Sequence, residues 1–496
     1  MGLEIDRETF TLEDHRVFVD KLRAGLDALE QVLLRPGFGA GPTTIGAEVE
    51  LDLVDRSARP APVADEVLAA LDSPCFTTEI NRFNLEYNAP PLPLRGRPFA
   101  ALRAQLEGAL ASVRAAAASL GVVPVSVGIL PTLEEHHLQG SMMTDKRRYR
   151  AISAALRAAQ EGPFNLRIRG RELLEVMVED VTSEGANTSL QVHLRCNPED
   201  FARTYNAAQV VTAPVVAASA NSPTFLGRVL WDETRIALFR QSVDDRPQAT
   251  SDDWRPARVS FGHGWARRGI HELFAESVAM HDPLLPVVSD EVPHEVLRAG
   301  GVPALAELRL HQGTVWRWNR AIYDSADGGH LRVEMRAMAS GPTPIDMAAN
   351  AALALGSTIA MRRDEEKWIA CFTFGQARRN FYEAARAGLD ADLLWPSRTG
   401  RPELRPAPVV VLELCDLAEA ALIEEGVEPS DASAAIEVVR RRIERRQNGA
   451  IWQRQSLDNI MTTSSSRSDA IDRVVRGYVA RATEGAPVHE WPLVDR

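Results

Sequence analysis

The chain has 496 residues, of which 45% are hydrophobic and 25% charged, so it can form a large core and has the composition of a globular protein. Its formal net charge of −12 argues against nucleic acid or an anionic membrane as the main partner. No run of about 18 apolar residues is present, so we expect no segment that spans a bilayer.

The cysteines and lysines further limit the cellular compartment and the kind of phosphate site that we expect. The four cysteines are scattered without a Cys-x-x-Cys pair, and the first ten residues lack the apolar core of a secretion signal. We therefore expect a cytoplasmic protein with reduced thiols. The lysines are Lys21, Lys146 and Lys367, and none lies in a GxxxxGK[ST] loop. Any phosphate binding must then depend largely on arginine and metal.

A strand at Thr43–Asp55 is the first clear pattern after an amphipathic helix over 11–34. Apolar residues alternate with polar ones, and the polar face carries Glu48, Glu50 and Asp52. Same-face neighbours on a strand are about 6.6 Å apart, so two such carboxylates can reach two adjacent cations or opposite sides of one. For this strand alone, a polar face turned to water is the alternative.

The same alternation returns in three later segments, Phe83–Asn88, Leu190–Cys196 and Leu331–Ala337. Their polar faces carry Asn84, Glu86 and Asn88; Gln191, His193 and Arg195; and Arg332, Glu334 and Arg336. If the four strands share a sheet whose apolar face packs on helices, the other face collects carboxylates, a histidine and arginines. Carboxylates suit Mg²⁺ and arginines suit phosphoryl oxygens, so this face is expected to bind Mg²⁺ and nucleotide phosphates.

Glu79 raises a problem of geometry. It precedes Glu86 by seven residues within Phe76–Tyr87, and this odd spacing would place the two carboxylates on opposite faces of a continuous strand. They converge only if the strand breaks or bulges at Asn81-Arg82. Otherwise Glu79 is an ordinary loop residue.

The remaining pattern is mainly helical. Before residue 364 we expect helices at Ala64–Leu71, Pro98–Leu120, Pro198–Ala220, Trp231–Gln241 and Ile345–Met361, strands at Val122–Leu130 and Leu173–Val181, and a loop-rich stretch over 245–305. After it we expect helices at Glu365–Ala387, Val409–Glu425, Ser430–Asn448 and Ser466–Ala482, with a proline-rich connector at Pro396–Pro408.

Two segments concentrate basic or aromatic residues. Met142–Arg150 contains Lys146 and three arginines. Such a run is typical of the solvated start of a helix, but it could also cover an anionic ligand. His311–Tyr323 is rich in tryptophan, which indicates packing in the core more than stacking on a ligand. Met142–Arg150 and Trp316–Arg320 are also our candidate lids.

Five motifs resemble those of the glutamate–cysteine ligases and the wider carboxylate–amine ligase family, which is related in fold to glutamine synthetase and the guanidino kinases. In chain order they are GAEVELDLVD (46–55), TTEINRFNLEYNAP (77–90), NTSLQVHLRCN (187–197), ANSP (220–223) and HLRVEMRAMASGP (330–342). Each motif is short, but all five occur in the family order. The resemblance implies an α+β fold with a curved, largely antiparallel sheet whose charged concave face is backed by helices. This catalytic domain would span 1–362, with a mostly helical region, 363–496, packed on it.

The resemblance also implies a ligand set. In that family six side chains hold Mg²⁺ ions that bridge ATP phosphates and the reacting carboxylate. Carried over motif by motif, they become Glu48, Glu50, Glu79, Glu86, Gln191 and Glu334. The third motif departs from the family pattern, because a family His position is Gln191 here and His193 fills the next polar position. Gln191 as the ligand, with His193 on nucleotide phosphate or a metal-bound water, and His193 as the ligand both stay open.

Cationic residues complete the assignment. By resemblance Arg336 contacts phosphoryl oxygens, and we give Arg235 a catalytic role beside it. Arg240 and Lys146 are assigned, with His193, to binding of the nucleotide.

The resemblance implies an ADP-forming ligase that uses ATP and Mg²⁺. The γ-carboxylate of glutamate would form an acyl phosphate, which the amine of cysteine then attacks, as in the first step of glutathione-type thiol synthesis. Three alternatives stay open: another acid or amine substrate, a nucleotide-binding relative without turnover, and a phosphotransferase. Loss of a metal carboxylate would mark the silent relative, yet all five acids are present.

Overall fold

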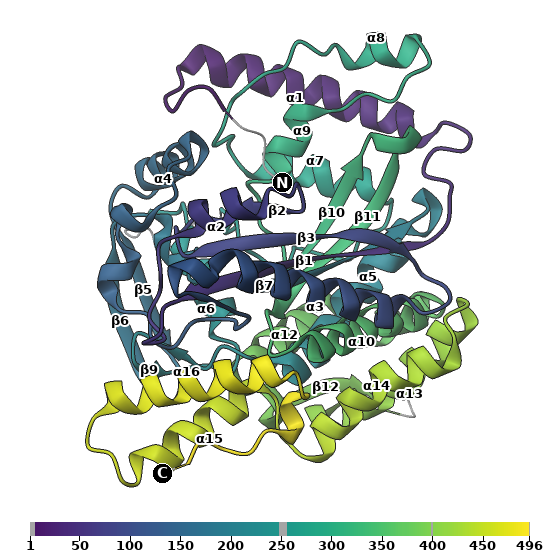
Figure 1. Cartoon of the computed structure of the whole chain (residues 1–496). Coiled ribbons are helices and arrows are strands. Elements are labelled where there is room, and N and C mark those ends of the chain that lie inside the picture. Colours follow the sequence, from purple (N-terminus) through teal and green to yellow (C-terminus); the bar gives the residue numbers. More distant parts are fainter. Residues whose placement is uncertain (1–4, 248–254, 398–399, 496) are drawn as a thin grey trace.

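We describe the computed structural model of the chain over residues 5–247, 255–397 and 400–495 (Figure 1). Its centre is a curved antiparallel sheet in the order β10-β11-β7-β1-β3-β2, and β4 pairs with the end of β1. The strands of this sheet are β1 (Thr44–Val54), β2 (Phe76–Thr78), β3 (Asn84–Pro93), β4 (Val123–Val125), β7 (Ser189–Cys196), β10 (Asn319–Asp324) and β11 (His330–Ala339).

The register of the sheet places the polar residues of four strands on one face. Glu50 lies opposite Glu86 of β3, and Glu48 lies opposite Gln191 of β7. Further along β7, His193 lies opposite Glu334 of β11. Cross-strand partners point to the same side of a sheet. The shared charged face predicted from the alternation is therefore present.

The other face of the sheet is buried under helices. Val49, Leu51, Val192 and Val333 belong to its core, each at most 2% exposed. Helix α5 packs on β11, α10 packs on β7 and on α5, and α3 packs on β3 and β4. Because α5 is apolar around most of its circumference, it is buried on all sides. These helices are α3 (Pro98–Ala117), α5 (Phe201–Ser219) and α10 (Pro344–Arg362).

Helices of the last third of the chain extend this layer. Helices α13 and α14 pack on α10, α12 packs on α5, and α15 and α16 pack on each other at the C-terminal end (Figure 1). Their bounds are α11 (Glu365–Cys371), α12 (Phe374–Ala387), α13 (Ala407–Glu424), α14 (Pro429–Glu444), α15 (Gly449–Met461) and α16 (Arg467–Glu484). The predicted α+β class, with a curved antiparallel sheet backed by helices and a helical C-terminal part, is confirmed.

The other helices and short hairpins surround the sheet. They are α1 (Leu12–Leu33), α2 (Ala64–Leu71), α4 (Arg147–Gln160), α6 (Thr234–Ser242), α7 (Ile270–Met280), α8 (Pro293–Arg298) and α9 (Ala306–Gln312), and the hairpins are β5 (Phe164–Arg169) with β6 (Leu173–Val178), β8 (Thr224–Phe225) with β9 (Arg228–Val229), and β12 (Asp392–Pro396) with β13 (Pro402–Pro406). No helix among the described residues is long and apolar enough to cross a membrane.

Some local predictions were wrong. The buried run Val122–Leu130 is a strand only over β4, because beyond it the chain leaves β1 and continues as irregular buried backbone. The stretch over 245–305 is mostly loop among its described residues, as predicted, although it also contains α7 and α8; its residues 248–254 lie outside the described residues. The connector Pro396–Pro408 is largely the hairpin β12–β13, with 398 and 399 outside the described residues. Helix α15 was not predicted.

The tryptophan-rich segment is part of the core, as its composition indicated. Trp318 is 2% exposed and packs on Phe239 and Phe381. Strand β10 begins at the next residue, so Asn319 and Arg320 belong to the sheet. Because the segment combines these strand residues with the buried Trp318, the interpretation of Trp316–Arg320 as a lid is wrong.

Candidate active site

Three carboxylates converge from β1, β3 and the turn after β2. One oxygen from each of Glu50, Glu79 and Glu86 lies within 4.8 Å of the others. Glu50 and Glu86 are direct cross-strand partners, and Glu79 follows β2, which pairs back onto β3. The break that convergence requires is therefore present, and Glu79 is a loop residue that reaches the sheet face. We call these three residues the acidic cluster.

Two other segments hold the turn that carries Glu79. Asn81 Nδ2 donates to the carbonyl of Thr182 over 3.0 Å, and Thr144 Oγ1 donates to the carbonyl of Glu79 over 2.6 Å. The Met142–Arg150 segment thus packs against this turn and also begins helix α4. It positions Glu79 in this structure, and its role as a lid stays a prediction.

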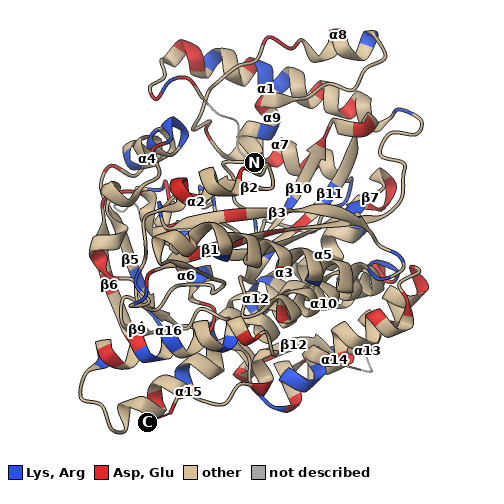
Figure 2. Ribbon diagram, viewed as in Figure 1, with Lys and Arg blue, Asp and Glu red and all other residues tan. Residues whose placement is uncertain are grey.

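Glu48, His193 and Glu334 form a second group beside the first, which we call the histidine cluster. His193 Nε2 is 3.1 Å from Glu48 Oε1 and 3.7 Å from Glu334 Oε1. Arg320 Nη2 and Arg336 Nη1 donate to the Glu334 carboxylate over 2.8 and 3.1 Å, and Arg320 Nε forms an ion pair with it at 2.6 Å. Burial acts to raise the pKa of Glu334, but the two arginines outweigh it and hold the pKa well below its ordinary value. Figure 2 shows acidic residues on β1 and β3 and basic residues on β10 and β11.

Gln191 lies between the two clusters. It is opposite Glu48 on β1, and its Nε2 donates to Glu50 Oε1 over 2.9 Å. The backbone N–H and the hydroxyl of Ser189 also donate to Glu50, over 2.7 and 2.9 Å. Gln191 Oε1 is buried and has no hydrogen-bond partner in the part of the chain that the structure describes. Gln191 and His193 are therefore both placed to reach a cation on this face.

The charge balance of the acidic cluster favours a cation. Burial raises the pKa of Glu79 well above its ordinary value, and repulsion from Glu86 and Glu50 adds to the shift. Burial likewise raises the pKa of Glu86 to about 7, with Glu48 and Glu50 adding to it. Carboxylate oxygens and a free amide oxygen are the hard donors that Mg²⁺ prefers. The residues of this face therefore fit a divalent cation.

Two charged residues near the clusters were not assigned from the sequence. From the sequence, Arg320 belongs only to a candidate lid, but in the structure it lies on β10 directly opposite Glu334 of β11. Glu184 follows a short 3₁₀ turn, and burial together with Glu50 raises its pKa to about 8 against the effect of Arg336 and Arg235. The alternation within β10 could have identified Arg320, whereas an irregular loop offers no periodicity that would single out Glu184.

The remaining predicted cations occupy different places. Arg235 of α6 is 3% exposed, and its Nη1 donates to the carbonyl of Ala337 over 3.2 Å. Burial raises the pKa of Glu50, and Arg235 is close enough to the face to reduce this rise. Arg240, on the same helix, lies with its guanidinium 5.7 Å from the ring centre of Tyr382. Lys146 directly precedes α4 and is half-buried. The nucleotide-binding roles of Arg240 and Lys146 stay predictions.

Comparison with known proteins gives one family match. The sequence model of glutamate-cysteine ligase family 2 matches residues 44–484. No curated protein sequence matches the chain. A glutamate–cysteine ligase from Francisella tularensis, solved in complex with AMP, is similar in structure with a TM-score of 0.54 and 11% identity, over 92% of this chain and 91% of that one. A bifunctional glutathione synthetase from Pasteurella multocida has a TM-score of 0.49 and 11% identity, over 95% of this chain and 55% of that one. At such identity the first of these likenesses shows the fold alone.

We expect the metal-free protein to lose stability as the pH rises from about 5 to about 7. The pKa of Glu86 is about 7 in the folded state, whereas a glutamate in an unfolded chain has a pKa of about 4.3. Between these values the folded state keeps a proton that the unfolded state has released, so raising the pH favours unfolding. Thermal unfolding in EDTA should show a steeper fall for the wild-type protein than for Glu86→Gln, which lacks the titrating group.

Added Mg²⁺ should counter this loss, because the ionised carboxylates are its ligands. The increase in Tm on adding Mg²⁺ should therefore be larger at pH 8 than at pH 6. Equal pH slopes for the wild-type protein and Glu86→Gln in EDTA would contradict the assignment.

Proposed function

Because the chain belongs to glutamate-cysteine ligase family 2, we propose that it is an ATP-dependent ligase that joins the γ-carboxyl group of glutamate to the amino group of cysteine. The observation that supports this most strongly is the pair of clusters on one sheet face, with Arg336 and Arg320 at their edge. Two cation sites beside fixed guanidinium groups suit the transfer of a phosphoryl group from ATP.

The proposed reaction has two chemical steps. An oxygen of the γ-carboxylate attacks the γ-phosphorus of ATP, the bond to ADP breaks, and an acyl phosphate forms. The amine of cysteine then attacks the acyl carbon, the bond to phosphate breaks, and nitrogen loses a proton. The products are γ-glutamylcysteine, ADP and phosphate, and no protein nucleophile is required.

The acidic cluster and the histidine cluster would hold Mg²⁺, with Gln191 between them. When bound, Mg²⁺ supplies positive charge that offsets the charge developing on the phosphate oxygens. Arg336 is half-buried, with its side chain 15% exposed, and its Nη1 donates to Glu334. Burial acts to lower its pKa, but Glu334, Glu48 and Glu50 outweigh this effect and raise the pKa above its ordinary value. It therefore stays charged and oriented, and we assign it to the phosphoryl oxygens and to the oxyanion of the second step.

Water must be kept from the acyl phosphate. The Met142–Arg150 segment is the part of the structure best placed to do so, because it packs on the turn that bears Glu79. Tyr149 of this segment donates from its hydroxyl to the carbonyl of Thr78, at the end of β2.

The direct test is a product assay with ATP, Mg²⁺, glutamate and cysteine. We expect release of ADP that requires both amino acids, and a dipeptide mass in the product. Glu50→Gln should lower kcat by about 100-fold or more while Tm changes little, since a carboxylate in the acidic cluster is lost. A stable phosphorylated acceptor would indicate a phosphotransferase, and ADP release with a different pair of substrates would contradict the proposed specificity.

Arg336→Lys should lower kcat strongly, by about 10-fold to 100-fold, although the charge is kept. Lysine cannot reproduce the planar guanidinium that contacts Glu334 and the phosphoryl oxygens together. Arg332→Lys, on the same strand and paired with Asp324, serves as the matched control. Wild-type kcat in Arg336→Lys would show that Arg336 is only a structural partner of Glu334.

Gln191 and His193 can be separated by the dependence of turnover on Mg²⁺. We expect Gln191→Ala to raise the Mg²⁺ requirement more than His193→Ala does, and His193→Ala mainly to weaken the use of ATP. The measurement is kcat/KM for ATP across a Mg²⁺ series. A larger shift in His193→Ala would assign His193 as the ligand.

A further inference from the structure

A buried chain of hydrogen bonds joins the C-terminal helices to the strand that carries the acidic cluster. The hydroxyl of Tyr478, on α16, donates to the carbonyl of Ser126 over 2.7 Å and accepts from Asn221 Nδ2 over 2.8 Å. Asn221 Nδ2 also donates to the carbonyl of Ser340 over 2.8 Å. Ser340 Oγ then donates to the carbonyl of Glu50 over 2.8 Å. These hydrogen bonds therefore connect α16 to the backbone of Glu50, a residue of the acidic cluster.

The polar side-chain groups of Asn221, Ser340 and Tyr478 are all hydrogen-bonded. The amide nitrogen of Asn221 has two hydrogens, and each has a partner. Its Oδ1 accepts from Gln453 Nε2 of α15 over 2.9 Å. Tyr478 is 2% exposed, and Asn221 and Ser340 are fully buried. Because buried polar groups are costly to leave unpaired, loss of one member disturbs its neighbours.

Two glycines allow the residues of this hydrogen-bond series to pack this closely. A Cβ on Gly341, whose φ is +81°, would lie 2.0 Å from the carbonyl oxygen of Ser126 and 2.9 Å from the hydroxyl of Tyr478. A Cβ on Gly449 would lie 2.0 Å from Asn221 Oδ1. Neither position can carry a side chain without displacing Tyr478 or Asn221.

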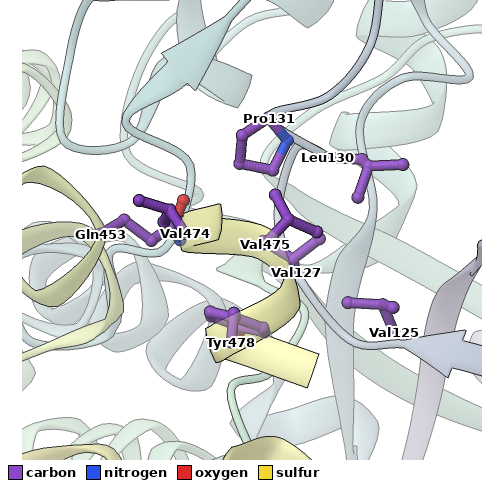
Figure 3. Close-up of a pocket in the computed structure, with 8 residues that line it drawn as sticks. All are labelled: Val125, Val127, Leu130, Pro131, Gln453, Val474, Val475 and Tyr478. Atoms are coloured by element: carbon purple, nitrogen blue, oxygen red, sulfur yellow. The ribbon is translucent and has the colours of Figure 1, made fainter. Parts of the chain in front are cut away.

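The surroundings of Tyr478 are otherwise apolar. Figure 3 shows its ring beside a small cavity between α15, α16 and the segment that follows β4. The cavity is lined by Val125, Val127, Leu130, Pro131, Gln453, Val474, Val475 and Tyr478. The ring also packs edge-on against Trp452 and Trp491. Packing therefore holds the ring in place independently of its hydroxyl, so that Tyr478→Phe removes the hydrogen bonds and keeps the packing.

We propose that Tyr478 is a positioning residue, whose hydroxyl sets the placement of Glu50 through Asn221 and Ser340 and thereby the affinity of the acidic cluster for a divalent cation. The side chain of Glu50 is fixed from one side by Ser189 and Gln191. Its backbone pairs with Glu86 on the β3 side, and past the end of the β1–β7 pairing its carbonyl accepts from Ser340. We assign both the side-chain and the Ser340 contacts a part in aiming this carboxylate at the others. The inference gives the C-terminal helices a role in the site and rests on the cation binding put forward in the proposed function.

The test is the binding of Mn²⁺, as a probe for Mg²⁺, to the full-length protein by isothermal titration calorimetry. Tyr478→Phe should weaken Mn²⁺ binding by about 10-fold. Tyr323→Phe is the matched control, because that buried hydroxyl also donates to a backbone carbonyl, of Pro303 over 2.7 Å, but lies on the apolar side of β10. Weakening by Tyr323→Phe to the same extent would overturn the proposal, since general destabilisation would explain both.

Ser340→Ala provides the second arm, because it removes only the bond to the Glu50 carbonyl and leaves α16 intact. It should weaken Mn²⁺ binding about as much as Tyr478→Phe. The double variant should be no weaker than either single variant, since both act through one chain. Additive losses of affinity in the double variant would overturn the proposal. Wild-type affinity in Ser340→Ala would also overturn it, and this result can be obtained even if Tyr478→Phe fails to fold.

Titration of the wild-type protein with Mn²⁺ tests the proposed cation sites separately from the positioning role of Tyr478. If the wild-type protein does not bind Mn²⁺, both the proposed cation sites and the positioning role are wrong. If it binds and the variants bind equally well, only the positioning role is wrong. In turnover, kcat/KM for ATP should recover in Tyr478→Phe at high Mg²⁺, a recovery that damage to the fold would not give.

Discussion

The antiparallel register of β1 with β3 and β7 is the constraint on which the site depends. It places Glu50 opposite Glu86 and Glu48 opposite Gln191. A slip of one residue in either pairing would turn the carboxylates into the core and the apolar residues outward. Burial of residues such as Val49 under the helices therefore fixes the register, and the core in this way determines where the charges lie.

The two clusters reach charge balance by different means. In the histidine cluster, Arg320 and Arg336 surround Glu334 and keep it ionised. In the acidic cluster, neutral donors from Ser189 and Gln191 contact Glu50, and burial raises the pKa of its members. The acidic cluster consequently gains more from a cation, and placing its carboxylates correctly requires support from the wider fold.

The sequence predicted the features that follow from strand periodicity. Alternation identified four strands and their shared face, because a half-buried strand must separate its polar and apolar residues. It left the convergence of Glu79 open, since this depends on a turn that Asn81 and Thr144 hold through contacts with distant segments. Glu184 and Tyr478 could not be found, because one lies in an irregular loop and the other on an ordinary amphipathic helix. Their relation to the site arises only from tertiary packing.

The central claim is that this sheet face holds a divalent cation at the acidic cluster and another at the histidine cluster. Anomalous diffraction from crystals soaked with Mn²⁺ and a non-hydrolysable ATP analogue tests it most directly. The account predicts a peak bounded by Glu50, Glu79 and Glu86 and another bounded by Glu48, Glu334 and either His193 or Gln191. Bound nucleotide with no Mn²⁺ peak at either cluster would contradict it.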